Sequence, residues 1–236
     1  MNIEGSVALV TGANRGLGRH FVERLLDRGA SKVYAASRNP TATVAGADVL
    51  PLDLLDQGTI DAAAAVAGDV TLLVNNAGIS TYQNLVRGDL SEIRREMDTH
   101  FFGTLAVTRA FADTLGRNGG GAIVNMLLAL SWFSWDGATS YRAAKAAEWS
   151  LTNASRVELA RQGTQVVGVH LGAADTDMMS GYDGPLLDPA DVVRAALDGL
   201  VAGAAEVLVD DWSRTVKAGL GQDPSAFYAQ VADSSP

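Results

Sequence analysis

Short apolar runs and longer segments with helical periodicity alternate along the whole chain. Runs of four or five residues rich in Val, Ile, Leu and Ala are typical of buried strands, and they lie at 7–10, 32–36, 48–52, 70–74, 122–125, 165–169 and 206–209. Between them, apolar residues recur every three or four positions, which predicts helices at 19–29, 60–66, 93–115, 140–161 and, as the last one, 191–200.

This alternation predicts the fold class. Strands separated by helices of this size are joined by right-handed crossovers and form a parallel sheet covered on both faces. The chain of 236 residues fits one domain, and it contains no repeat or convincing linker. We therefore predict one doubly wound α/β domain over 1–236, with about seven parallel strands and helices on both faces.

Composition excludes several functional classes. The net charge of −9 disfavours nucleic acid and anionic membranes as partners. The absence of cysteine excludes disulfides and thiolate catalysis. The N-terminus shows no secretory signal, and the apolar stretch 122–135 is too short and too polar to span a bilayer. We expect a cytoplasmic protein with a small-molecule substrate and no metal site.

A glycine-rich turn follows the first strand run. Gly12, Gly16 and Gly18 precede the helical pattern that begins at Arg19. Without a Cβ, glycine lets backbone N–H groups approach a diphosphate, and the N-terminus of the following helix attracts the same anion. The turn predicts a dinucleotide site, although the turn alone leaves a purely structural role open.

Three motifs in chain order resemble the short-chain dehydrogenase/reductase family. They are TGANRGLG at 11–18, NNAG at 75–78 and YRAAK at 141–145, and the resemblance covers nearly the whole chain. It implies a Rossmann-like domain with a cofactor half over about 1–120 and a catalytic and substrate half over about 121–236. Because Tyr141 and Lys145 are four residues apart on a helix, they share one face.

The family resemblance gives this pair its chemistry. A nearby ammonium favours phenolate, so we expect Lys145 to lower the pKa of Tyr141 and make it a usable acid or base. The resemblance implies that Lys145 also binds the nicotinamide ribose. The alternative is an ordinary Tyr–Lys neighbour pair on an exposed helix.

The residues at the end of the second strand bear on cofactor choice. An NAD site usually has an acid there, whereas this chain has Ser37 and Arg38. Arg38 and Arg15 could pair with a 2′-phosphate or be solvated surface residues, and we predict NADP(H). Asp53 resembles the family's adenine-contacting acid, with a turn role as the alternative. The predicted cofactor-binding residues are Gly12, Asn14, Arg15, Gly16, Leu17, Gly18, Ser37, Arg38, Asp53, Leu54, Asn75, Ala77, Gly78, Tyr141, Lys145, Gly172 and Thr176.

The chain departs from the family pattern at the reaction centre. The family's catalytic serine, thirteen residues before the tyrosine, corresponds to Leu128. Losing one such donor costs about 10²–10³ in rate. Ser131 could substitute or be an ordinary loop serine. The family's relay asparagine corresponds to His100, which could serve a proton relay or be a buried histidine satisfied by backbone. Gly172 and Thr176 remain from the family's PGxxxT pattern, without its proline.

Aromatic residues gather before the Tyr141 helix and suit an apolar or aromatic substrate, although core and subunit packing would also explain them. Gly181, Gly184 and Pro185 suggest a short mobile lid over about 178–189. The predicted substrate-pocket residues are Leu128, Ser131, Trp132 and Tyr182.

These features together predict an NADP(H)-dependent carbonyl or imine reductase. Hydride would reach a C=O or C=N carbon while Tyr141 supplies the proton, assisted by Lys145 and His100. A protonated imine needs no oxyanion donor, so the leucine at 128 favours C=N. Two alternatives stay open: a non-redox enzyme such as a dehydratase, isomerase or cyclase, and a catalytically silent nucleotide-binding regulator. The resemblance also implies a homodimer or homotetramer.

Overall fold

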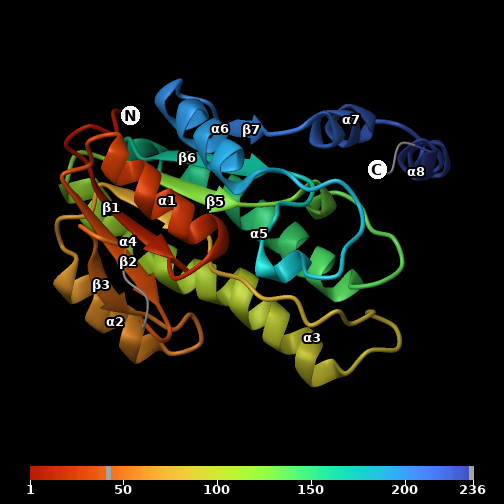
Figure 1. Ribbon diagram of the computed structural model, residues 1–236, viewed down its shortest axis with the longest axis horizontal. Helices are drawn as coiled ribbons and strands as arrows, with labels where there is room; N and C mark the ends of the chain where they lie inside the picture. Colours follow the sequence, from red (N-terminus) through yellow and green to blue (C-terminus); the bar gives the residue numbers. More distant parts are fainter. Residues whose placement is uncertain (41–43, 234–236) are drawn as a thin grey trace.

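Seven parallel strands form one sheet in a computed structural model that describes residues 1–40 and 44–233 (Figure 1). The strand order is β3-β2-β1-β4-β5-β6-β7. The strands are β1 (Val7–Thr11), β2 (Lys32–Ser37), β3 (Asp48–Pro51), β4 (Leu72–Asn75), β5 (Ala122–Met126), β6 (Gln165–His170) and β7 (Glu206–Leu208). This sheet confirms the predicted doubly wound α/β fold.

Helices follow the strands as the periodicity predicted. They are α1 (Gly16–Asp27), α2 (Gln57–Val66), α3 (Leu90–Met97), α4 (Thr104–Arg117), α5 (Thr139–Glu158), α6 (Pro189–Val201), α7 (Asp211–Gly219) and α8 (Pro224–Asp233). The long helix expected over 93–115 is present, but a π-helical segment, η1 (Asp98–Gly103), joins α3 to α4. Such segments often occur at functional positions, and this one carries His100.

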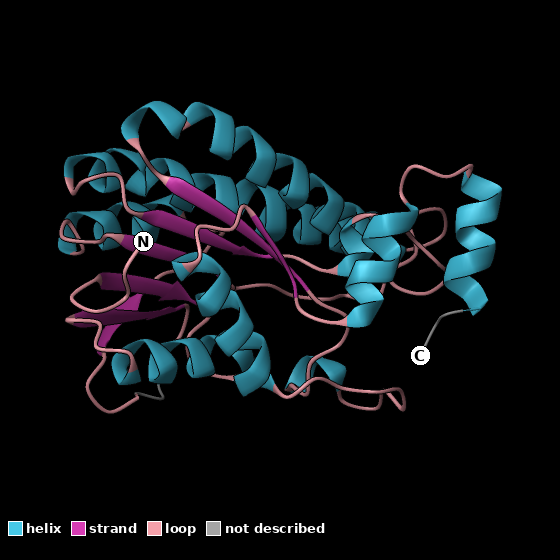
Figure 2. Cartoon of the chain, turned by 90° about the horizontal axis from the view of Figure 1, so that it is seen from above, coloured by secondary structure: helices cyan, strands magenta, loops and turns pink. Residues whose placement is uncertain are grey.

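Helices cover both faces of the sheet (Figure 2), and each face holds its own apolar core. Side chains alternate between faces along each strand, so Val10 joins one core and Leu9 the other. Phe21 of α1 and Val192 of α6 fill the first core. Phe111 of α4 belongs to the second, together with residues of α2. The sheet is thus rigidly held, and its loops are free to carry function.

The prediction that 191–200 is the last helix was wrong, because α7 and α8 follow β7. The sequence does contain their signals. The Asp210 side chain caps α7 by accepting a hydrogen bond from the Ser213 N–H, and Phe227 and Val231 of α8 lie four residues apart and are both buried. Both helices lie beyond the carboxyl ends of the strands (Figure 1) and pack on the loop that follows β5.

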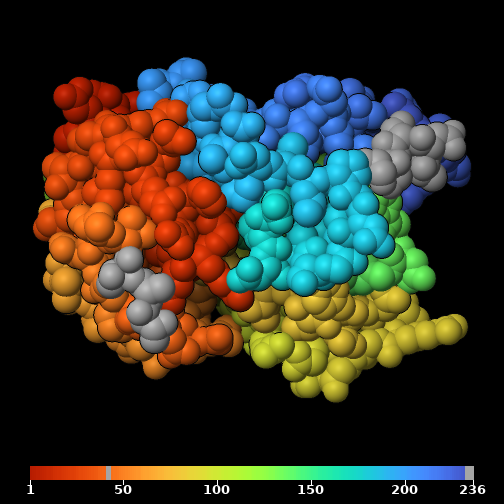
Figure 3. Space-filling view, in the orientation of Figure 1, coloured from red at the N-terminus to blue at the C-terminus, as the bar shows by residue number. Residues whose placement is uncertain are grey.

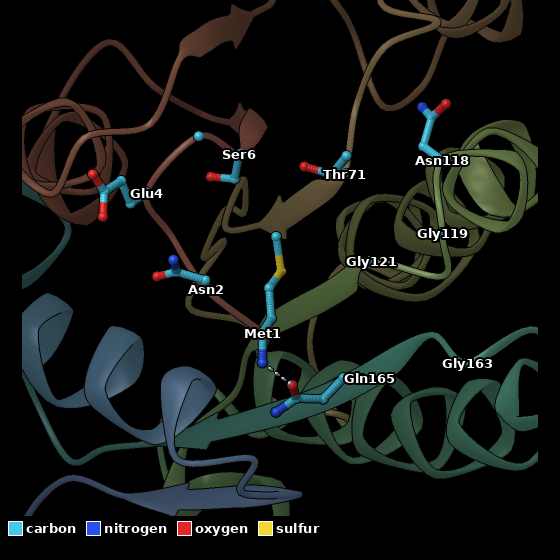
Figure 4. A pocket seen from close by; sticks show the side chains of 11 residues that line it. Met1, Asn2, Glu4, Ser6, Thr71, Asn118, Gly119, Gly121, Gly163 and Gln165 are labelled. Atoms are coloured by element: carbon cyan, nitrogen blue, oxygen red, sulfur yellow. Dashed lines mark hydrogen bonds between the residues drawn. The ribbon is translucent and has the colours of Figure 1, made fainter.

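A hollow of about 410 Å³ lies at the opposite edge, where the strands begin (Figure 4). Its lining includes Thr71, Asn118 and Gln165, and the Met1 ammonium donates a hydrogen bond to the Gln165 side chain at 3.3 Å. Within the described part of the chain, none of the predicted site residues lines it. A search of the same residues finds no helix long and apolar enough to cross a membrane.

Candidate functional site

The predicted site residues gather at the carboxyl edge of the sheet. The strand order reverses between β1 and β4, and ligands of open α/β sheets bind at that crevice. The glycine turn follows β1, the NNAG segment follows β4, and Gly172 and Thr176 follow β6. Tyr141 and Lys145 lie on α5, beside the loop that follows β5 and carries Leu128, Ser131 and Trp132.

Neutral hydrogen bonds fix the two loops at the reversal point. Thr11 Oγ1 accepts from the backbone N–H groups of Asn76 at 3.0 Å and Ala77 at 3.1 Å. The Asn76 side chain donates to the Thr11 carbonyl at 2.9 Å. Gly12 has φ +69°, and a Cβ there would lie 2.9 Å from Ala77 Cα. Only glycine fits both this backbone conformation and this contact.

The N-terminus of α1 is available to an anion. Aspartate side chains cap the N-termini of five other helices, namely Asp56 for α2, Asp89 for α3, Asp188 for α6, Asp210 for α7 and Asp223 for α8. Helix α1 follows Arg15 without a side-chain cap and has no acidic residue in its first turn. Its first N–H groups, at Gly16, Leu17 and Gly18, therefore need another partner, and a diphosphate fits that need.

The end of β2 carries hydroxyl, amide and guanidinium groups. Ser37 Oγ donates to Asn14 Oδ1 at 2.8 Å, and Asn14 Nδ2 donates to the Asn39 carbonyl at 2.7 Å. Arg38 is exposed. The Arg15 guanidinium pairs with Asp177 at 3.2 Å, but both side chains are more than two-thirds exposed, at 75% and 71%. Such a pair is weak, and the binding of a phosphate by Arg15 remains a prediction.

Three predicted cofactor residues have structural contacts of their own. Asp53 Oδ1 accepts from the Leu55 N–H at 3.1 Å, which is the turn role left open by the sequence, and Leu54 packs beside the second core. The buried Asn75 side chain donates to Asn125 Oδ1 at 2.8 Å and ties β4 to β5. Their binding roles remain predictions.

Tyr141 and Lys145 share the inner face of α5, as the spacing predicted. Tyr141 is partly buried, and its hydroxyl lies 4.0 Å from Met178 Sδ. The His100 ring meets the Tyr141 ring edge-on at 5.2 Å between centroids. Lys145 is buried, and its Nζ donates to the Met126 carbonyl at 2.7 Å and to Glu148 Oε2 at 2.7 Å.

The structure contains groups that oppose the expected effect of Lys145 on the pKa of Tyr141, and that effect stays a prediction. Burial, followed by the nearby carboxylates Glu148 and Glu96, raises the pKa of Tyr141 well above its ordinary value. Burial alone would raise the pKa of Glu148 as well, but Lys145 and His100 outweigh it and lower that pKa. The Lys145 ammonium is thus paired with Glu148, and burial together with the two carboxylates favours the neutral phenol of Tyr141.

His100 is fully buried and bonded to backbone. Its Nε2 lies 2.8 Å from the Ile79 carbonyl, whereas Nδ1 lies 3.6 Å from Glu148 Oε2. A Cβ on Gly78 would come within 2.5 Å of the His100 ring, so glycine is needed at 78 for this ring to fit. The backbone contact matches the second interpretation of His100. The contact with Glu148 keeps a relay role open as a prediction.

The loop after β5 carries the Ser131 hydroxyl near the position of the missing serine, and its role as a substitute remains a prediction. Buried Ser131 Oγ accepts from the Leu128 N–H at 3.2 Å, which is an ordinary loop role. Trp132 stacks on His170 with ring centroids 3.8 Å apart, and the Lys217 ammonium lies 4.7 Å from the Trp132 ring. Packing, the alternative left open for these aromatics, therefore accounts for Trp132, and its role in a substrate pocket remains a prediction.

The segment 178–189 lies over the site. In Figure 3 it appears in cyan, against the N-terminal part in red and orange and the chain around 80–100 in yellow. The Tyr82 hydroxyl donates to the Met178 carbonyl at 2.6 Å. Tyr182 is 40% exposed. This position fits the predicted lid, whose motion remains a prediction.

Sequence reasoning missed two buried carboxylates, Glu148 and Glu96. The signal for Glu148 was present, because it lies three residues after Lys145 and seven after Tyr141 on the same helical face. A charged residue on a stripe predicted to be buried indicates a paired charge. Glu96 binds the Ser140 hydroxyl at the start of α5, a long-range contact without a local pattern.

The fold and this site define a doubly wound α/β protein built to hold a dinucleotide at the reversal of its strand order. The family model for short chain dehydrogenase matches residues 6–184. The chain belongs to this family of oxidoreductases.

Relatives support this assignment. A 3-oxoacyl-acyl-carrier-protein reductase of Vibrio harveyi is 31% identical over 188 residues, which cover 75% of this chain and 77% of the relative. A short chain dehydrogenase from Burkholderia cenocepacia, solved in complex with NADP, is 37% identical with a TM-score of 0.93 over 100% of both chains. A 3-ketoacyl-acyl-carrier-protein reductase from Brucella melitensis, complexed with NADH, is 27% identical with a TM-score of 0.80, covering 86% of this chain and 96% of that one.

Proposed function

We propose that this protein is an NADP(H)-dependent reductase. It transfers hydride to a C=O or C=N carbon of an apolar or aromatic small molecule, and Tyr141 donates the proton. The observation that carries this proposal is the position of the partly buried Tyr141, four residues before the buried Lys145 on α5, at the carboxyl edge of the sheet. A protonated phenol is the form that a reduction requires.

The residues present fit the cofactor. The uncapped N-terminus of α1 suits a diphosphate, and the end of β2 bears Ser37 and Arg38 rather than an acid. The relative that was solved with NADP supports the same choice. An ammonium has three donors, and Lys145 uses two, so one remains for a ribose hydroxyl. When bound, the nicotinamide supplies the hydride.

The chain's own residues handle the proton and orient the substrate. Tyr141 releases its hydroxyl proton to the substrate oxygen or nitrogen as the carbon is reduced. Leu128 stands at the family's serine position and has no polar hydrogen to donate, and Ser131, three residues further on, is oriented to accept from the Leu128 N–H. A carbonyl oxygen would then lack the donor that a serine at 128 would supply, whereas an imine nitrogen that takes the Tyr141 proton becomes an iminium ion, which needs no second donor. This geometry favours C=N among the two substrate classes.

We also propose a homodimer or homotetramer. Phe102, on η1 beside α4, is 55% exposed and lines a shallow hollow with Leu105 and Ala106. An apolar surface of this kind is typical of subunit contacts.

The test follows NADPH absorbance with a panel of cyclic imines and matched ketones. We expect imines to consume NADPH, and Leu128→Ser to move the preference toward ketones. Product without NADPH consumption would instead identify a dehydratase, isomerase or cyclase. Binding of NADPH without turnover of any compound would favour the regulator.

A further inference from the structure

The loop that follows β6, residues 171–178, crosses the candidate site. Asp177 pairs with Arg15 of the glycine turn at 3.2 Å, and the next residue, Met178, places its Sδ 4.0 Å from the Tyr141 hydroxyl. The far end of this loop thus lies between the proposed diphosphate site and the proposed proton donor. The conformation of the loop therefore shapes the space for the reactive end of a dinucleotide.

The near end of the loop is bonded to a C-terminal helix through Asp210. One carboxylate oxygen, Oδ2, accepts from the Gly172 N–H at 2.7 Å, and the other, Oδ1, accepts from the Ser213 N–H at 2.7 Å and caps α7. Within the described residues, no other side chain accepts from a backbone N–H of 171–178. The backbone of Leu187 also bonds to this loop, but Leu187 lies in the same excursion between β6 and α6. Asp210 therefore connects the loop to a separate element.

The same contact accounts for the glycine at 172. The backbone of Gly172 lies outside the left-handed region, so its conformation alone would accept alanine. A Cβ there would lie 2.9 Å from Asp210 Oδ2. The carboxylate thus occupies the space that a larger residue would need. In addition, Leu171 stands where the family pattern has a proline, so the loop lacks the restraint that a proline ring gives.

Helix α7 is itself held against the loop after β5. Trp212 of α7 meets the Phe133 ring edge-on at 5.7 Å between centroids and lies 6.0 Å from the Trp135 ring. Phe133 is buried in the apolar cluster that α7 and α8 form with this loop. Through Trp212 and Asp210, α7 therefore contacts the loops after β5 and β6 at once.

We propose that Asp210 is a positioning residue for the cofactor: by bonding Gly172 to α7, it holds the loop after β6 in the conformation that receives the nicotinamide half of NADPH. It acts through the loop rather than on the cofactor. This inference rests on the proposed function, which places the nicotinamide at this edge, and it gives the C-terminal helices a part in cofactor binding.

The test compares two ligands in Asp210→Ser. Serine keeps an N-cap acceptor for α7, but its shorter side chain does not also reach Gly172. We expect the dissociation constant of NADPH, measured by calorimetry, to rise about tenfold, the usual effect of losing one hydrogen bond to a charged group. The constant for 2′-phospho-ADP-ribose, which lacks the nicotinamide, should change less than twofold. Asp223→Ser, the same change at the cap of α8, should leave both constants unchanged.

A direct measurement of the bond is amide hydrogen exchange at Gly172, followed by NMR in the protein without ligand. The exchange rate should rise about tenfold in Asp210→Ser and stay unchanged in Asp223→Ser. Gly172→Ala tests the same contact with Asp210 intact, because its methyl group displaces the carboxylate. It should weaken NADPH binding about as much as Asp210→Ser, and the double variant should bind little worse than either single variant.

Three outcomes overturn the proposal: NADPH affinity in Asp210→Ser equal to that in Asp223→Ser, an equal loss for both ligands, or additive losses in the double variant. If Asp210→Ser fails to fold, Gly172→Ala with the same two ligands decides the question. The expected pattern of affinities, with no imine or ketone consuming NADPH, supports the role of Asp210 and counts against the reductase function.

Discussion

Two stretches of the carboxyl edge of the sheet differ in how their polar side chains are bonded. Around the reversal between β1 and β4, polar side chains such as Thr11 and Asn76 bond to backbone, and the α1 N–H groups stay free. Around α5 and the ends of β5 and β6, ionisable side chains are buried, as in the Lys145–Glu148 pair and in His170, which stacks on Trp132. The first stretch leaves backbone N–H groups available to a ligand, whereas the second contains buried charged side chains.

This difference predicts how each stretch responds to change. A neutral hydrogen bond contributes about 1 kcal/mol, but removing one partner of a buried ion pair costs about 3–5 kcal/mol. Substitutions near β1 and β4 should therefore act on shape and ligand binding. Substitutions near α5, and changes of pH, should act on proton transfer and on stability.

The largest effect is expected for Tyr141→Phe, which removes the proposed proton donor. Turnover of any active compound should fall by about 10²–10⁴, while NADPH affinity measured by calorimetry stays within a factor of a few. Tyr228→Phe, a change at a residue that is 44% exposed, is the control. Equal turnover in wild type and Tyr141→Phe would remove Tyr141 from the chemistry.

Low pH should reduce the stability of the folded protein through His170, a buried residue of the second stretch. Burial, foremost, lowers its pKa to about 4, below the unfolded value of about 6.5. Between these values the unfolded state binds a proton that the folded state does not, so stability falls as pH drops, by up to about 3 kcal/mol.

Urea unfolding at several pH values between 7 and 4 measures this loss. The pH dependence should weaken in His170→Gln and persist in His20→Gln, where the histidine lies on the surface of α1. A profile for His170→Gln as steep as that of the wild type would contradict the assignment.

Gly12→Ala tests the first stretch through shape alone. The positive φ and the contact with Ala77 should together cost about 1–3 kcal/mol in unfolding free energy and weaken NADPH binding. Gly5→Ala is a matched control, because Gly5 has φ +77° and a Cβ added there would meet no atom within 4 Å beyond its chain neighbours. If both variants lose the same stability and neither loses affinity, the close packing of the two loops is unimportant.

The smallest expected effect is a change in the preference for NADPH over NADH. Ser37→Asp places a carboxylate at the end of β2, where it would accept from a ribose 2′-OH and repel a 2′-phosphate. We expect the ratio of NADPH to NADH affinities to fall by roughly ten- to a hundredfold. Ser31→Asp, just before the same strand, should leave that ratio unchanged, and an unchanged ratio in Ser37→Asp would count against NADP(H) selectivity at this position.

Local sequence patterns were sufficient to predict the strands of the sheet and the positions of the motif residues. Strand runs and helix stripes are short-range signals, so the order of elements followed from spacing. The C-terminal helices were missed although Asp210 and Pro224 mark their starts, because their apolar faces are short. Their packing partners, on the loop after β5, lie far away in the sequence.

The motifs did not predict how the charged side chains of the site are arranged. The YxxxK spacing placed Tyr141 and Lys145 on one face, but the sign of the pKa shift depends on how Glu148 and Glu96 fold against them. Glu96 comes from another helix, so its effect appears only in three dimensions. The position of Ser131 likewise depends on the conformation of its loop, which turns its hydroxyl toward the Leu128 N–H.

The aromatic side chains that pack around the C-terminal helices also provide the protein with intrinsic fluorescent probes. All four tryptophans of the chain, Trp132, Trp135, Trp149 and Trp212, lie in the second half, and Trp132 stacks on His170. Their fluorescence therefore samples the charged stretch and not the glycine turn. Energy transfer from these indoles to a reduced nicotinamide would signal its arrival at the carboxyl edge. Protonation of His170 would quench Trp132 separately, giving each stretch its own optical signature.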